Sequence, residues 1–175
     1  SSHEPFRVPY KRPDDAGANS YAYVDHCFGE FIDELKKTPA WKDTLIVMLG
    51  DHGCNDDPQQ SGKYMHHIPL LLLGGAVKEP RRIDTVMCQT DLAATLLGQM
   101  GVSHDEFVFS RDVTADTYTR HFAFHTYNNG YLLRDEQGHT LYDNVGHIAI
   151  EGHDEEREEM ARVILQQLYT NLAKL

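Results

Sequence analysis

A carboxylate and an imidazole stand side by side immediately after an apolar run. Residues 45–49 read LIVML, and Gly50 then leads into Asp51 and His52. An adjacent Asp and His form a good ligand pair for Zn²⁺ or Mn²⁺, and Gly53 permits the tight backbone that such a pair needs. The alternative is structural, with Asp51 capping a turn and His52 forming a hydrogen bond nearby. The tripeptide alone leaves both interpretations open.

Two further motifs place histidines beside apolar or rigid segments. His66 and His67 lie in YMHHIPLLLL, at the entrance to a second apolar run. His3 lies in SSHEPF, next to two small hydroxyl residues and ahead of a rigid Phe-Arg-Val-Pro run. A single histidine of this kind is more often structural than catalytic. Three such motifs in one short chain favour a common site.

The elements that must position these residues are short apolar strands. The continuous run over 45–49 is typical of a parallel strand that is covered on both faces, and IPLLLLGG over 68–75 predicts a second buried strand. In open α/β sheets, ligands bind where loops converge over the carboxyl ends of the strands. If the two strands are neighbours, His66 and His67 can approach Asp51 and His52.

The rest of the chain predicts helices and a β-meander. Apolar residues recur at helical spacing over 19–37, 89–101 and 154–174, and the last segment begins with the acidic run DEEREE. Residues 121–144 alternate and carry turn signals at Asn129-Gly130 and near Gly138. The predicted fold class is therefore α/β, with a parallel core and an antiparallel appendage.

Composition excludes several classes of function. A net charge of −11 argues against a nucleic-acid partner, since phosphate backbones are bound by clustered Lys and Arg. No apolar run approaches the length of a membrane span, and no signal peptide opens the sequence. The opening SSHEPFRVPY has the character of an internal segment, so we expect the chain to be part of a longer protein.

Four motifs together resemble one known superfamily. SSHEPF, the helix and strand ending in LIVMLGDHG, HHIPLLLLGG and IDTVMCQTDLAATLLGQMGV are similar, in order and spacing, to the C-terminal part of sulfatase and alkaline-phosphatase superfamily proteins. The resemblance is closest to lipoteichoic acid synthases and membrane phosphoglycerol transferases. It covers residues 1–110, whereas 111–175 match only in general outline. It implies a partial alkaline-phosphatase-like sheet with flanking helices, followed by a C-terminal β-meander and helix. All 175 residues would form one domain, the C-terminal portion of a larger catalytic domain.

The resemblance also implies roles for individual residues. Asp51 and His52 would be ligands of one divalent metal ion, with Mn²⁺, Zn²⁺ and Mg²⁺ as the options. His3 would be catalytic, contacting the transferred group or protonating the leaving group. His66 and His67 both match the position of a substrate-binding histidine, and both are retained as candidates.

The implied activity is metal-dependent transfer or hydrolysis of phosphodiester or sulfate esters through a covalent intermediate. The family's nucleophile and its acidic metal ligand lie upstream of the SHxPF motif, so we expect this chain alone to be inactive. The substrate would be a phospholipid-type or sulfate ester. The implied location is extracytoplasmic, on a membrane anchor in a missing N-terminal region. That region of the same protein, or an oligomer, would cover the exposed sheet edge. The competing hypothesis is a catalytically inactive α/β module that binds a partner.

Overall fold

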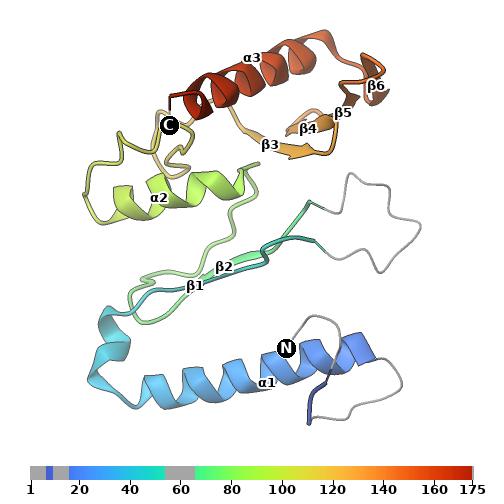
Figure 1. The fold of residues 1–175 in the computed structure, drawn as a ribbon. Helices are drawn as coiled ribbons and strands as arrows, with labels where there is room; N and C mark the ends of the chain where they lie inside the picture. The colour runs from blue at the N-terminus through green and yellow to red at the C-terminus, as the bar shows by residue number, and fades with distance from the viewer. Residues whose placement is uncertain (1–6, 10–15, 54–65, 175) are drawn as a thin grey trace. The chain divides into compact units, whose positions relative to one another are not determined.

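A computed structural model describes residues 7–9, 16–53 and 66–174 (Figure 1). The described residues divide into two compact units. One unit comprises those within Ser1–Gly50 and Pro69–Arg81, and the other comprises those within Asp51–Ile68 and Arg82–Leu175. His3 falls outside the described residues. Its predicted catalytic role therefore stays a prediction.

The first unit contains a long helix and a two-stranded sheet. Helix α1 (Ala16–Lys36) carries Lys36 in its last turn, where a cation complements the helix dipole. A short 3-10 helix, η1 (Pro39–Asp43), links α1 to β1 (Ile46–Leu49), and β2 (Leu70–Leu73) completes the unit's sheet. The helix and the two strands were predicted, although α1 begins three residues before the predicted start at residue 19.

The prediction of parallel strands buried on both faces is wrong for this sheet. β1 and β2 pair in the antiparallel sense, with Ile46 opposite Leu73 and Leu49 opposite Leu70. Leu49 is 38% exposed and Leu71 is 53% exposed, so the strands are only partly covered. A short apolar run looks the same in either pairing sense, because its composition reflects hydrophobicity and not strand direction.

The second unit is built on the predicted β-meander. Helix α2 (Leu92–Gln99) follows the 3-10 helix η2 (Gln89–Asp91) and stops before Gly101, which adopts a positive φ of 67°. The meander consists of four antiparallel strands in the order β3-β4-β5-β6. Their bounds are β3 (Phe122–Tyr127), β4 (Gly130–Asp135), β5 (His139–Asp143) and β6 (Ile148–Glu151). Asn129, with φ 67°, forms the predicted turn between β3 and β4.

Helix α3 (Glu155–Leu172) covers one face of the meander, as Figure 1 shows within this unit. Tyr131, Leu133 and Ala161 are fully buried and form the core cluster, with Phe124 and other partly buried residues packed against it. The predicted acidic start of α3 is confirmed: Asp154 accepts a 2.9 Å hydrogen bond from the Arg157 backbone N–H. Among the described helices, none is both long and apolar enough to cross a bilayer.

Candidate functional site

Antiparallel pairing brings the two predicted motifs to the same end of the β1–β2 sheet. The Leu49–Leu70 pair is the last of the ladder, at the end where β1 finishes and β2 begins. Asp51 lies two residues beyond Leu49, and His67 lies three residues before Leu70. Parallel strands would have sent these segments to opposite ends of the sheet. The corrected strand direction is therefore the one that suits a shared site.

Asp51 and His52 form an exposed and locally ordered pair. Their side chains are 91% and 67% exposed, and the His52 backbone N–H donates to Asp51 Oδ1 at 3.1 Å. His52 Nδ1 lies 2.8 Å from the Gly53 carbonyl oxygen. A carbonyl oxygen only accepts, so Nδ1 must carry the proton in this contact. In the neutral ring, Nε2 then presents its lone pair, which is the usual arrangement of a metal-ligating histidine.

The spacing of the two candidate ligand atoms is compatible with one shared metal ion. His52 Nε2 lies 3.8 Å from Asp51 Oδ2. With metal–ligand bonds of about 2.1 Å, two ligands of one ion lie about 3.0 Å apart at a right angle and about 4.2 Å apart on opposite sides. The observed distance falls between these limits. The donor set, one carboxylate and one neutral imidazole, fits Zn²⁺ or Mn²⁺.

The described part of the chain supplies only this pair of ligands. Within residues 7–9, 16–53 and 66–174, no group of three or more His, Cys, Asp or Glu side chains is arranged to hold a metal ion. A protein metal site normally takes at least three protein ligands. The pair therefore fits part of a coordination shell, and the remaining ligands must come from elsewhere.

The two histidines before β2 have different surroundings. His66 is partly buried, and its ring stacks on the ring of His125 in β3 with centroids 3.7 Å apart and planes inclined by 27°. Burial lowers the pKa of His66 below its ordinary value. Burial also lowers the pKa of His125, and the neighbouring His66 lowers it further. His67 is exposed, and no hydrogen bond or ring contact to it occurs within the described residues.

His125 is a residue that sequence reasoning missed. Its place in the alternating FAFHTY segment indicated a meander strand and nothing more. Strand alternation puts it on the opposite face from Phe124, which packs in the core with Tyr131 and α3. A histidine next to a core phenylalanine is a weak signal, and in the described part of the chain the contact with His66 links it to the candidate site.

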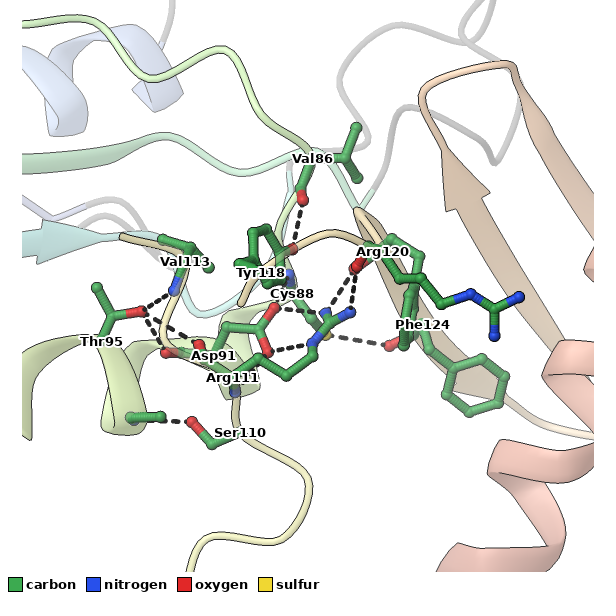
Figure 2. A network of polar contacts seen from close by, with 12 residues as sticks. Val86, Cys88, Asp91, Thr95, Ser110, Arg111, Val113, Tyr118, Arg120 and Phe124 are labelled. Carbon is green, nitrogen blue, oxygen red and sulfur yellow. Dashed lines mark hydrogen bonds and ion pairs between the residues drawn. The ribbon is translucent and has the colours of Figure 1, made fainter. Parts of the chain in front are cut away.

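A second polar network joins α2 to the segment that follows it (Figure 2). The Asp91 carboxylate is fully buried and accepts from the Cys88 backbone N–H at 2.8 Å and the Arg111 backbone N–H at 3.0 Å. Arg111 also donates from Nε at 2.8 Å and from Nη2 at 2.6 Å. Further donation to the carbonyls of Phe122 and Arg120 occupies four of its five N–H groups. Because its donors are committed, Arg111 stabilises the fold and is not free to bind an anion.

Comparison with known proteins assigns the family. The sequence model described as Sulfatase matches residues 3–102, which is more than half of the chain. The chain therefore belongs to the sulfatase family. Its fold is also that of a crystallised alkaline phosphatase superfamily protein from Vibrio parahaemolyticus, with a TM-score of 0.72 and 22% identity. The similarity covers 97% of this chain and 47% of the crystallised one.

Curated relatives include enzymes that act on different esters. An endo-4-O-sulfatase of Bacteroides thetaiotaomicron is 31% identical over 86 residues, which are 45% of this chain and 17% of the relative. A phosphopentomutase of Acetivibrio thermocellus is 29% identical over 93 residues, 53% of this chain and 23% of the relative. An arylsulfatase K of Gallus gallus is 29% identical over 82 residues, 43% of this chain and 15% of the relative. The chain thus spans less than a quarter of each of these relatives.

Proposed function

We propose that this member of the sulfatase family supplies part of the active site of a metal-dependent enzyme that cleaves or transfers phosphodiester or sulfate esters. The observation that carries the proposal is the Asp51–His52 pair, with Nδ1 donating to Gly53 and Nε2 lying 3.8 Å from the carboxylate. A carboxylate and a neutral imidazole with this spacing match the ligand chemistry of a divalent ion. Mn²⁺, Zn²⁺ and Mg²⁺ are the candidates. The identities of the relatives as sulfatases and a phosphopentomutase support an ester of an oxyanion as substrate.

In this proposal Asp51 and His52 hold the ion, and the hydrogen bonds within residues 51–53 orient them. The bound ion would lower the pKa of the attacking hydroxyl and neutralise charge on the transferred group. His67, which is exposed in the segment just before β2, contacts the oxygens of the transferred group. His66 remains the other candidate for that contact. His3 protonates the departing oxygen. The nucleophile that forms the covalent intermediate lies upstream of this chain.

The finer assignment is a phosphoglycerol-transferase-like enzyme acting on a phospholipid-type substrate. It rests on the resemblance of SSHEPF, GDHG and HHIPLLLL to that branch of the superfamily. The proposal places the enzyme outside the cytoplasm, anchored to a membrane through a preceding region of the same protein. That region would also complete the metal ligands and cover the partly exposed sheet of the first unit. Hydrolysis of a sulfate ester is the alternative activity for the same site.

Turnover of two model esters distinguishes the options. The full-length protein is assayed on bis(p-nitrophenyl) phosphate and on p-nitrophenyl sulfate, before and after treatment with a chelator. We expect metal-dependent turnover of at least one ester and a kcat/KM lower by at least about tenfold in Asp51→Ala and His67→Ala. Asp43→Ala is the matched control, because Asp43 is 80% exposed and lies at the other end of β1. Turnover that survives the chelator, or an Asp51→Ala variant as active as Asp43→Ala, would contradict the proposal. An intact fold without turnover of either ester would favour a binding module.

A further inference from the structure

The stacked pair His66–His125 joins the segment just before β2, residues 66–69, to strand β3 of the β-meander. His125 lies in β3, whose only strand neighbour in the described sheet is β4. Its ring projects from the face opposite Phe124 and therefore away from the core that α3 covers. His66 reaches this face from the segment just before β2, and the ring centroids are 3.7 Å apart. At this distance, with the ring planes inclined by 27°, the two rings are in direct stacking contact.

Both histidines of this pair have a pKa below the ordinary value. Burial is the cause of the lowered pKa of His66, and burial together with His66 lowers the pKa of His125. Within the described residues no carboxylate contributes to either pKa. Lowered pKa values favour the uncharged form of both rings, and two uncharged rings stack without charge repulsion. The contact is held by packing, and an aromatic ring of similar size can imitate it.

The chain between His66 and β2 has little freedom. Pro69 fixes its own φ and restricts Ile68 to extended conformations. Only His67 remains between the stacked ring and this restricted pair. Since the His66 ring is held against His125 and Ile68 is restricted by Pro69, the backbone leaves His67 few directions.

We propose that His125 is a positioning residue of the candidate site, because its stack on His66 holds the segment just before β2 in place. The stack thereby sets the direction in which His67 faces the substrate. The functional part of this inference rests on the proposed function. β3, which carries none of the family's motifs, would then act on the reaction through a neighbour. Nothing in the local sequence of β3 indicates such a role.

Histidine-labelled full-length protein tests the anchor without any enzymatic assay. The ring proton resonances of His66, assigned with a His66→Gln variant, are followed by NMR as a function of pH. In the wild type we expect His66 to titrate below its ordinary pKa and to show the ring-current shift of a stacked ring. His125→Ala should raise its pKa toward the ordinary value and remove that shift, whereas His125→Phe should retain both. His121→Ala is the matched control, since His121 precedes the same strand but contacts Glu136 and Tyr118. An unchanged His66 in His125→Ala would overturn the proposal.

Turnover of the ester that the wild type uses tests the consequence for His67. We expect kcat/KM per folded molecule to fall on the order of tenfold in His125→Ala and to stay within about threefold of wild type in His125→Phe. Equal losses in the two variants, or no loss in either, would overturn the positioning role. A role confined to folding would lower the unfolding midpoint and leave kcat/KM unchanged. If the wild type turns over neither ester, the proposed function fails, while the NMR titration still decides whether His125 holds His66.

Discussion

Removal of the Arg111 side chain should destabilise the second unit strongly, because it leaves a buried carboxylate with too few partners. In Arg111→Ala the fully buried Asp91 keeps the backbone N–H groups of Cys88 and residue 111 but loses two charge-assisted bonds of 2.8 and 2.6 Å. The bonds from Arg111 to the carbonyls of Phe122 and Arg120 are lost as well. The guanidinium also stacks on the Phe122 ring at 3.7 Å, and that packing is removed too.

The magnitude follows from the burial of the two partners. Breaking a buried ion pair by removing one member costs about 3–5 kcal/mol. The Arg111 side chain is 27% exposed, so solvent screens part of the interaction and we take the lower end, about 3 kcal/mol. The matched control is Arg120→Ala, which removes an ion pair with Glu156 whose side chains are 73% and 88% exposed. An exposed pair of this kind contributes about 0–1 kcal/mol.

Urea unfolding of the wild type and both variants, followed by circular dichroism, provides the free energies of unfolding. The expected order is wild type, then Arg120→Ala close to it, then Arg111→Ala well below. A loss in Arg111→Ala no larger than that in Arg120→Ala would refute the reasoning that the Asp91–Arg111 pair holds α2 to the following segment.

Two further predictions concern backbone conformation and pH. Gly152→Ala should lower the free energy of unfolding by roughly 2 kcal/mol or more, because Gly152 has a φ of 61° and a new Cβ would collide with the His139 carbonyl. Gly29→Ala, in open space within α1, should instead gain about 0.5–1 kcal/mol, and equal effects would contradict this contrast. Glu136→Gln should destabilise the protein more near pH 5.5 than near pH 8.5, because the hydrogen bond from His121 to Glu136 raises the pKa of His121. Because the pKa of His121 is raised in the folded state, this stabilisation is present below the pKa of His121 in the unfolded chain and is lost as pH rises through its folded-state pKa. A difference in unfolding midpoint between wild type and Glu136→Gln that does not change with pH would contradict this prediction.

The secondary structure of the second unit could be predicted because its signals are local. The acidic run after Asp154 marks a helix start, and Asn129-Gly130 marks a hairpin turn, whatever the rest of the chain does. The pairing sense of β1 and β2 could not be predicted in the same way. It depends on how the intervening chain returns, whereas the apolar runs of residues 46–49 and 70–73 are compatible with either sense.

The residues of the candidate site also differ in whether a local sequence pattern could indicate them. Asp51 and His52 could be proposed as metal ligands from sequence, since a carboxylate and an imidazole at the end of a strand are residue types that bind metals. His125 could not, because the described residues link it to the site through a ring contact with His66, which is far away in the chain. The Asp91–Arg111 pair carried a faint signal, an aspartate just before an apolar helix, but its partner twenty residues later shows no pattern of its own.

Metal content is the most direct test of the central claim that Asp51 and His52 hold a divalent ion. Full-length protein is purified without chelator, and bound metal is measured by inductively coupled plasma mass spectrometry for wild type, Asp51→Ala, His52→Ala and the exposed control Asp43→Ala. We expect about one divalent ion per chain in the wild type and the control, and an affinity lower by at least about tenfold in the two ligand variants. A wild type that binds no divalent ion, or an Asp51→Ala variant that binds as much as Asp43→Ala, would contradict it.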